Sequence, residues 1–206
     1  MSMPENICSG LSEAEKCDRG LWYSIEFPGR AEAHLACDDL CWEYNQARPS
    51  DLANLERILR RLFGKVGKNP YVEPSIWCGF GTNIEVGDNF YANNNCVFVD
   101  PAKITFGDNV FIGPMCGFYT AIHALNAELR NQAYEKALPI TVGDNVWFGG
   151  SCTILPGVTI GSNTVIGAGS VVTKDIPSGV LAFGNPCTVR REIGEGDKQE
   201  ILSQRK

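Results

Sequence analysis

The chain holds only two histidines, and one of them, His123, stands where a side chain could do acid–base chemistry. A neutral imidazole titrates near working pH and can take a proton from a hydroxyl that attacks an acyl carbon. Glu128 and Glu135 follow in the same segment, and either carboxylate could orient the ring. The sequence therefore predicts a general base at His123 and leaves its partner open. For His34, an ordinary core or surface position without a catalytic role is favoured.

Other catalytic arrangements fit these residues less well. No nucleophile-elbow motif supports Ser–His–Asp catalysis. A zinc carbonic anhydrase usually needs three histidine ligands, which is more than the chain contains. His34, Cys37 and Cys41 share one helical face but lack an evident fourth ligand, whereas structural zinc normally has four. We therefore expect no metal.

A strict period of six residues defines the scaffold that must position His123. Apolar side chains recur at this spacing at Val142, Phe148, Ile154, Ile160, Ile166 and Val172. The same frame appears earlier, at Phe80, Val86, Ala92 and Phe98 and, after a two-residue slip, at Phe106, Ile112 and Phe118. Faces of an α-helix recur every 3.6 residues, so a helix cannot use this period, whereas a short strand followed by a corner can. Hexad repetition is typical of a parallel β-helix.

Two further hexad positions fit such a prism. Glycine recurs at the second position, where tight corners would require unusual φ and ψ angles: Gly81, Gly87, Gly107, Gly113, Gly143, Gly149, Gly161 and Gly167. The fifth position carries no charged residue and includes Cys78, Cys96, Cys116 and Cys152. Free cysteine packs there as a small hydrophobe, and a thiol buried in apolar surroundings is unreactive. We therefore expect reduced core thiols rather than disulfides or a nucleophile.

The pattern divides the chain into three parts. Residues 1–70 are predicted to be an N-terminal α-helical cap, and residues 71–192 the β-helix. Residues 123–140 leave the repeat as one long inserted loop, and function tends to reside in such excursions. Residues 193–206 form a polar C-terminal tail.

Within the cap, the spacing predicts two helices that pack against one end of the β-helix. The first covers residues 31–44, with Leu35, Leu40 and Trp42 as its apolar positions. The second follows Pro49, with Ser50 as its N-cap and Gly64 at its end. The fold class is thus mainly β with a helical cap.

Composition limits the partners and the compartment. The net charge of −6 and the isoelectric point near 5.0 argue against nucleic acid or an anionic membrane as the main partner. The first residues show no apolar core and no basic leader, and no apolar run is long enough for a membrane span. A cytoplasmic location is predicted, which also suits an odd count of nine cysteines.

The chain resembles the maltose and galactoside O-acetyltransferases of the hexapeptide-repeat acyltransferase family. Similarity covers most of residues 20–192 and is carried by FGTNIEVGDNFYANNNCVFVD, FYTAIHALNAELR, LPITVGDNVWFGGSCTILPGVTIG and IGAGSVVTKDIPSGVLAFGNP. GLWYSIEF and LRRLFGKVGKNPYVEPSIWCGFG resemble the cap of that family. The resemblance implies a left-handed parallel β-helix, a homotrimer, and an acetyl-CoA groove between neighbouring subunits.

The resemblance also implies roles for particular residues. His123 matches the catalytic base, Asn93 the asparagine beside the acceptor, and Tyr91 an aromatic residue that contacts the acceptor. Glu135, in the inserted loop, is placed with the substrate-binding residues. The side chains and backbone groups that resemble the CoA-binding stretch are Trp147, Gly149, Gly150, Ala168, Thr173, Lys174 and Arg191, with the Gly150 N–H as donor to the thioester oxygen.

Departures from the family pattern concentrate on the acceptor side. Ile122 and Ala124 flank His123 where a small or polar residue and then proline are usual. Ile25 and Gly79 stand where polar residues are common, and Thr188 replaces an arginine of the CoA tail region. The first prediction is transfer of an acetyl group from acetyl-CoA to a hydroxyl of a sugar or sugar-like molecule. The alternatives are transfer to a less polar secondary-metabolite hydroxyl or amine, and a non-catalytic trimeric scaffold.

Overall fold

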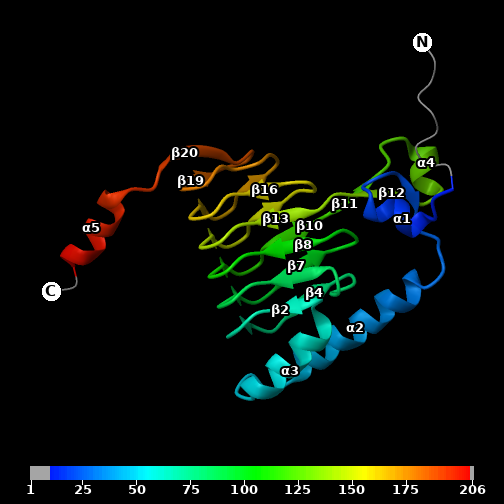
Figure 1. Cartoon of the computed structure of the whole chain (residues 1–206), viewed down its shortest axis with the longest axis horizontal. Helices are drawn as coiled ribbons and strands as arrows, with labels where there is room; N and C mark the ends of the chain where they lie inside the picture. Colours follow the sequence, from blue (N-terminus) through cyan, green and yellow to red (C-terminus); the bar gives the residue numbers. More distant parts are fainter. Residues whose placement is uncertain (1–9, 205–206) are drawn as a thin grey trace, which may run out of the picture.

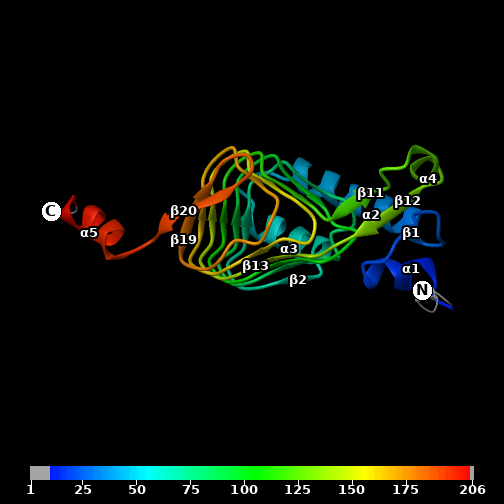
Figure 2. The same cartoon turned by 90° about the horizontal axis from the view of Figure 1, so that it is seen from above.

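A triangular prism of short parallel strands forms the body of the protein (Figures 1 and 2). The computed structural model describes residues 10–204. Each coil contributes one strand to each of three sides, which we name faces 1, 2 and 3 in the order in which the chain visits them. The corners between them are named corner 1–2, corner 2–3 and corner 3–1. The predicted parallel β-helix is confirmed.

The strands are short. Face 1 consists of β2 (Lys65–Val66), β5 (Ile84–Val86), β8 (Ile104–Phe106), β13 (Ile140–Val142) and β16 (Thr159–Ile160). Face 2 consists of β3 (Tyr71–Val72), β6 (Tyr91–Ala92), β9 (Phe111–Ile112), β14 (Trp147–Phe148), β17 (Val165–Ile166), β19 (Val180–Phe183) and β20 (Thr188–Glu192). Face 3 consists of β4 (Ile76–Cys78), β7 (Cys96–Val99), β10 (Gly117–Tyr119), β15 (Thr153–Ile154) and β18 (Val171–Val172).

Apolar side chains at the first and fifth hexad positions fill the axis of the prism. Phe98 and Phe118 stack with ring centroids 5.3 Å apart, and Phe106 and Phe148 meet Phe118 edge-on. Burial of one such ring contributes about 1.5–3 kcal/mol, so this stack holds together coils whose strands are only two to four residues long. The four fifth-position cysteines named above are also buried, as predicted.

Corner 1–2 shows why glycine occupies the second hexad position. Gly87, Gly107 and Gly143 do not have a positive φ, contrary to the prediction. A Cβ atom on any of them would lie within 2.8 Å of the backbone of the next coil, so only glycine allows the coils to approach. The left-handed conformation falls two positions later, for example on Asn109 and Asn145 with φ of 55° and 57°. Asparagine tolerates this conformation better than most L-residues.

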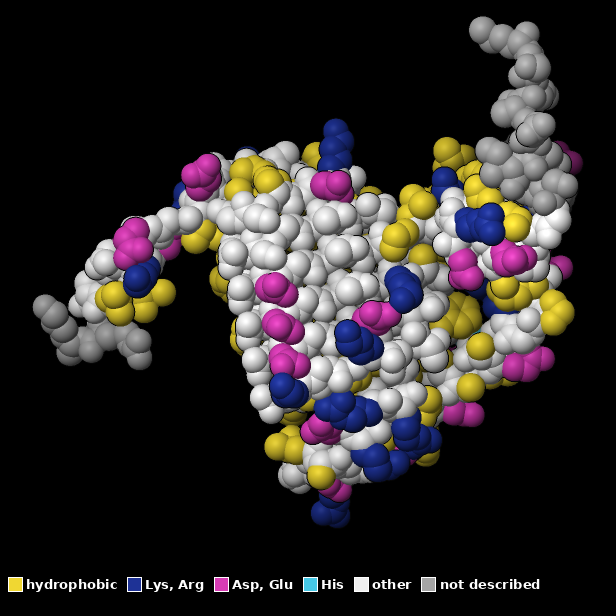
Figure 3. All heavy atoms as spheres, viewed as in Figure 1, with side chains coloured by type: hydrophobic (Ala, Val, Ile, Leu, Met, Phe, Trp, Pro, Cys, Tyr) yellow, Lys and Arg dark blue, Asp and Glu magenta, His cyan; other side chains and the backbone are white. Residues whose placement is uncertain are grey.

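Two ladders of polar side chains run along corner 1–2. Asp108 Oδ1 accepts the N–H of Asp88 at 2.7 Å, and Asp144 Oδ1 accepts the N–H of Asp108 at 2.8 Å. One position later, Asn109 Nδ2 donates to Asn145 Oδ1 at 3.1 Å. Figure 3 shows acidic side chains gathered in a column along one edge of the body. The aspartate bonds satisfy backbone N–H groups where the chain turns, and the asparagine bond joins side chains of successive coils.

The cap contains more structure than the two predicted helices, α2 (Arg30–Gln46) and α3 (Leu52–Leu62). A short helix α1 (Glu13–Asp18) and strand β1 (Tyr23–Ser24) precede them. α3 lies at the first coil, and α2 runs from there toward the inserted segment (Figure 1). Asp51, not Ser50, is the N-cap of α3, with its side chain accepting the N–H of Asn54.

The predicted apolar face of α2 was wrong at two of its three positions, since of these only Leu40 packs against the core. Leu35 and Trp42 are exposed, whereas Cys37, Cys41 and Tyr44 are buried against the prism. The buried positions follow helical spacing, but two cysteines and a tyrosine give a weaker hydrophobic signal than leucine and tryptophan.

The inserted segment is ordered rather than an open loop. β11 (Ala121–His123) and β12 (Tyr134–Ala137) form an antiparallel hairpin with the short helix α4 (Ala127–Asn131) at its tip. β1 of the cap pairs with β12 as a third strand. This pairing joins segments far apart in the sequence, so the local pattern could not reveal it. The hairpin leaves the prism at corner 3–1, between β10 and β13.

The C-terminal tail includes α5 (Glu195–Ser203), which extends away from the prism after β20 (Figures 1 and 2). Among residues 10–204, none of the helices combines the length and apolar character needed to cross a membrane.

Candidate active site

His123 and Glu135 face each other across the hairpin. They occupy paired positions on β11 and β12, and His123 Nε2 lies 3.8 Å from Glu135 Oε2. The histidine side chain is 57 % exposed, whereas the carboxylate is only 7 % exposed. Glu128, the other candidate carboxylate, lies on the exposed α4. The hairpin register thus distinguishes two glutamates that the sequence left equivalent.

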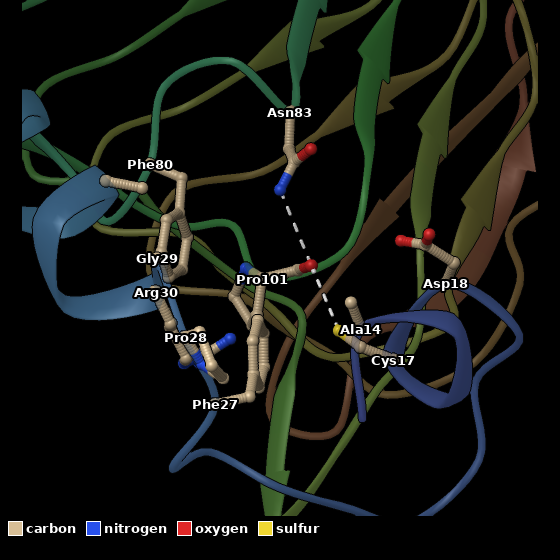
Figure 4. Close-up of a pocket in the computed structure, with 11 residues that line it drawn as sticks. Ala14, Cys17, Asp18, Phe27, Pro28, Gly29, Arg30, Phe80, Asn83 and Pro101 are labelled. Carbon is tan, nitrogen blue, oxygen red and sulfur yellow. Dashed lines mark hydrogen bonds between the residues drawn. The ribbon is translucent and has the colours of Figure 1, made fainter. Parts of the chain in front are cut away.

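Tyr23 and Arg30 hold the Glu135 carboxylate from the cap side. The Tyr23 hydroxyl donates to Glu135 Oε1, and Arg30 Nη2 lies 3.2 Å from the same oxygen. Burial, together with the bond to Glu135, raises the pKa of Tyr23 well above its ordinary value, so the phenol stays protonated as a donor. The Arg30 guanidinium also lies 4.8 Å from the Phe80 ring centroid, an arrangement visible in Figure 4.

These contacts fix the carboxylate before any ligand binds. Two donors and aromatic packing restrict Glu135 to one position, with its second oxygen directed at the imidazole. Sequence analysis missed Tyr23 and Arg30, because both lie more than a hundred positions from Glu135 and no local signal links them.

A cavity of about 350 Å³ adjoins Glu135 and is the candidate acceptor pocket. Its wall combines apolar and aromatic side chains with few polar groups: Ile25, Arg30, Ala31, His34, Trp77, Gly79, Phe80, Val99, Pro101 and Glu135. Ile25 and Gly79, noted above as departures, both line it. His34, for which no role was predicted, is also in this wall, with Nδ1 2.7 Å from the carbonyl oxygen of Gly79.

Tyr91, Asn93 and Trp147 gather around a second cavity, of about 370 Å³, on face 2. Tyr91 is stacked on Tyr71, with ring centroids 6.0 Å apart, and Trp147 is 55 % exposed. Asn93 Oδ1 accepts the N–H of Asn94 at 2.8 Å, so its amide nitrogen is the group left to donate. This second cavity therefore presents a flat aromatic wall with one polar group beside it.

Gly149 and Gly150 form the peptide at corner 2–3 just after Trp147. The Gly149 carbonyl points into the prism and accepts from the thiols of Cys116 and Cys152 at 3.2 and 3.1 Å. In a trans peptide the N–H points opposite to the carbonyl, so the Gly150 N–H faces outward. Among the described contacts neither this N–H nor that of Ala168, one coil further on, has a partner. Two open backbone donors thus lie side by side.

The remaining predicted CoA residues lie toward the C-terminal end of the prism. Thr173 and Lys174 are exposed at corner 3–1 just after β18. Arg191, on β20, forms a bidentate pair with Asp197, at 2.6 and 2.9 Å. That pair holds the pKa of the Asp197 carboxyl well below its usual range. To contact a phosphate of CoA, the Arg191 guanidinium would have to release the Asp197 carboxylate.

The predicted residues therefore form two groups in a single chain. His123 and Glu135 lie on the hairpin at corner 3–1, whereas Tyr91, Asn93 and Trp147 lie on face 2 or at its edge. Figure 2 shows the hairpin and the strands of face 2 on opposite sides of the prism. Within the described chain, the base and the open backbone donors are not brought together.

One group of potential metal ligands also converges. Among residues 10–204, the sulfurs of Cys37, Cys41 and Cys78 lie within 4.8 Å of one another. Cys78 was assigned to core packing, and the sequence grouped only His34, Cys37 and Cys41.

The fold defines a class: parallel β-helix proteins built from hexads, with an inserted segment that carries an exposed histidine. Residues 139–174 match the family described as bacterial transferase hexapeptide (six repeats), and residues 16–67 match the maltose acetyltransferase hexapeptide capping motif. Galactoside O-acetyltransferase of Escherichia coli is 42 % identical over 198 residues, spanning 96 % of this chain and 93 % of that one.

Solved structures give the same result. A galactoside acetyltransferase in complex with coenzyme A superposes with a TM-score of 0.89 at 42 % identity, over 91 % of this chain and 94 % of that chain. A hexapeptide-repeat acetyltransferase from Vibrio cholerae, complexed with acetyl coenzyme A, has a TM-score of 0.82 at 37 % identity, over 89 % of this chain and 100 % of that one. The chain therefore belongs to the hexapeptide-repeat acetyltransferase family of the maltose and galactoside O-acetyltransferases. The resemblance seen in the sequence is confirmed.

Proposed function

We propose that this protein transfers the acetyl group of acetyl-CoA to a hydroxyl of a sugar or sugar-like small molecule, with His123 as general base. The observation that carries the proposal is the exposed His123 ring facing the fixed Glu135 carboxylate. Acetyl-CoA is the co-substrate, since related acetyltransferases of the same fold bind coenzyme A or acetyl coenzyme A.

The reaction follows from these groups. The neutral imidazole takes the proton of the acceptor hydroxyl as its oxygen attacks the thioester carbon, and the resulting imidazolium is stabilised by the Glu135 carboxylate. The proton then passes to the leaving thiolate of CoA. In this scheme Asn93 positions the acceptor and Tyr91 packs against it. No covalent enzyme intermediate is needed.

The open N–H of Gly150 is the proposed donor to the oxygen that becomes negative in the tetrahedral intermediate. A fixed backbone donor in a site shielded from water is an effective oxyanion stabiliser, and removal of one such donor typically costs about 10²–10³ in kcat. Trp147 and Gly149 would line the pantetheine arm, and the Ala168 N–H would bind it. Thr173, Lys174 and Arg191 would hold the remainder of CoA.

A complete site in this scheme requires more than one copy of the chain. His123 stands on the hairpin at corner 3–1, and the Gly150 N–H opens at corner 2–3, so one whole face separates them. A neighbouring subunit could place its corner 2–3 against this hairpin. The triangular section of the prism suits three such contacts, and we therefore propose a homotrimer with a site at each subunit interface.

The cavity wall favours a second acceptor class. Ile25, Trp77 and Phe80 make the pocket beside Glu135 largely apolar. An acceptor with an apolar face, such as a secondary-metabolite hydroxyl or amine, would bury more surface there than a simple hexose.

A cytoplasmic location stays a prediction, which fractionation of the source cells would check.

Replacement of His123 tests the proposal. The full-length protein is assayed for CoA release with acetyl-CoA and a panel of sugars, small alcohols and amines. We expect His123→Ala to lower turnover by about 10²–10⁴ while the rise in melting temperature caused by CoA is retained. Glu135→Gln should also lower turnover, whereas Glu128→Gln, on the exposed helix, should not. Turnover within a few-fold of the unmodified protein in His123→Ala would exclude this mechanism.

A further inference from the structure

Three cysteine sulfurs meet where α2 packs against the first coils of the prism. Cys37 and Cys41 are one helical turn apart and face the prism, and Cys78 ends β4. The Cys78 sulfur lies 3.6 Å from that of Cys37 and 3.5 Å from that of Cys41. All three side chains are at most 3 % exposed. We name Cys37, Cys41 and Cys78 the thiol triad.

Ordinary core packing explains burial of a cysteine but does not require three sulfurs to converge. The Cys37 thiol donates to the carbonyl oxygen of Cys78 at 3.2 Å, and the Cys78 sulfur lies within hydrogen-bond distance of both other sulfurs. A thiolate, rather than a thiol, is the form that binds metal ions.

We propose that the thiol triad is a three-coordinate site for a soft, thiolate-binding cation, with Cu(I) as the best-matched ion. Three sulfurs that share one ion in trigonal geometry at about 2.3 Å lie about 4.0 Å apart, compared with the two separations of 3.5 and 3.6 Å seen here. Soft sulfur ligands without nitrogen or oxygen donors favour Cu(I). The Cys78 sulfur would have to move away from each of the other two by about 0.4–0.5 Å, and all three sulfurs already lie within 4.8 Å of one another.

Zinc fits this site less well because a fourth ligand is missing. Structural zinc is almost always four-coordinate. His34 is the nearest candidate, one turn before Cys37, but its Nδ1 lies 2.7 Å from the Gly79 carbonyl oxygen and its ring is not among the converging ligand atoms.

Binding requires no oxidant or reductant. Each Cu–S bond that forms replaces an S–H bond, so uptake of one Cu(I) releases as many as three protons to the buffer. The ion would join α2 to β4. Cys78 directly precedes Gly79, and Gly79 and His34 both line the cavity beside Glu135. Occupancy would therefore stiffen one wall of the candidate acceptor pocket.

Anaerobic titration of the reduced full-length protein with Cu(I), delivered from a chelator complex, tests the proposal. We expect one Cu(I) per chain, proton release, and X-ray absorption showing three sulfur neighbours per copper. The melting temperature should rise by about 5–10 °C once free Cu(I) exceeds the dissociation constant about 100-fold. Absorption spectroscopy needs no variant, so the test does not depend on whether a cysteine replacement folds.

Cysteine variants separate the triad from other buried thiols. Cys41→Ala and Cys37→Ala should each weaken Cu(I) binding by at least about 100-fold, whereas Cys152→Ala, which removes a thiol of the Cys116–Cys152 pair, should not. The proposal is overturned if no copper binds, if only two sulfurs surround it, or if Cys152→Ala abolishes binding. A preference for Zn(II) over Cu(I) would also overturn it.

Discussion

Corner 1–2 and corner 2–3 of the prism use the same hexad backbone for opposite purposes. At corner 1–2 the third hexad position holds Asp88, Asp108 and Asp144, and each of these aspartates accepts the N–H of the preceding coil. At corner 2–3 the corresponding residues include Gly150 and Ala168, which carry no such acceptor and whose N–H groups have no partner among the described contacts. One corner is closed by its own side chains, and the other is open to a ligand.

The difference depends on residue type and not on backbone shape. Both corners have a residue with positive φ at the fourth hexad position: Asn145 at corner 1–2 and Ser151 at corner 2–3. At corner 1–2 these asparagines also bond to one another, whereas Ser151 has no such ladder. A repeat scaffold can therefore assign stability to one edge and ligand binding to another by changing two positions in each hexad.

Among variants at the corners of the prism, the largest expected effect comes from closing the open corner. Gly150→Pro removes the proposed oxyanion donor and should lower kcat by about 10²–10³, with little change in melting temperature. Proline already occupies this position one coil earlier, as Pro114, so the corner accommodates it. Gly150→Ala is the matched control, because it keeps the N–H and its Cβ would lie 3.3 Å from the Pro114 carbonyl oxygen. Equal activity in both variants would show that the N–H does not contribute.

The next largest effect is expected at corner 3–1. There the buried Asp100 accepts backbone N–H groups, as the exposed aspartates do at corner 1–2. Asp100 Oδ1 accepts the N–H groups of Gly79 and Phe80 at 2.8 and 2.9 Å, whereas Oδ2 is buried without a partner. Burial raises the pKa of Asp100 to about 6. The unfolded value is about 3.9, so the folded state binds this proton more tightly, and stability falls as the pH rises from about 4 to 6.

Asp100→Asn should remove that pH dependence. It keeps the acceptor oxygen without the buried charge, and should raise the free energy of unfolding at pH 7 by about 2–3 kcal/mol. Urea unfolding at pH 4, 5, 6 and 7 measures the effect. Asp144→Asn, at the exposed corner, is the control and should leave the profile unchanged. Parallel profiles for Asp100→Asn and the unmodified protein would contradict the assignment.

A smaller effect is expected when the asparagine ladder is interrupted. Asn145→Ala removes two side-chain hydrogen bonds. It also leaves an alanine at φ 57°, a left-handed conformation that alanine tolerates less well than asparagine. The free energy of unfolding should fall by about 2 kcal/mol, with kcat unchanged. Asn145→Gly separates the two contributions, since glycine accepts this φ but cannot bond to its neighbours. If glycine is as damaging as alanine, the ladder bonds dominate.

The smallest effect is expected for the aspartate ladder. Asp144→Ala leaves the Asp108 N–H to water at an exposed corner, and should lower the free energy of unfolding by about 0.5–1.5 kcal/mol. Activity should not change, because corner 1–2 is remote from the proposed groove. A loss of turnover in a folded Asp144→Ala protein would contradict the assignment of stability to corner 1–2 and of ligand binding to corner 2–3.

Sequence reasoning succeeded where the information is local and repeated. Apolar residues six positions apart specify the prism, since each coil meets only its neighbours and the register recurs. His123 was recognisable because it stands where the repeat stops. The class of enzyme followed from motifs such as GDNVW and GAGSVVTKD, and the match to the hexapeptide transferase family confirms it.

Only the tertiary structure decided which distant residues meet. The β1–β12–β11 sheet selects Glu135 over Glu128 as the neighbour of His123 and adds Tyr23 and Arg30 to it. The packing of α2 on β4 buries Cys37 and Cys41 beside Cys78 and leaves Leu35 and Trp42 exposed. Periodicity records which face of an element is buried, but it does not specify which residue from elsewhere in the chain will lie against that face. That choice depends on long-range contacts, whose geometry exists only once the chain is folded.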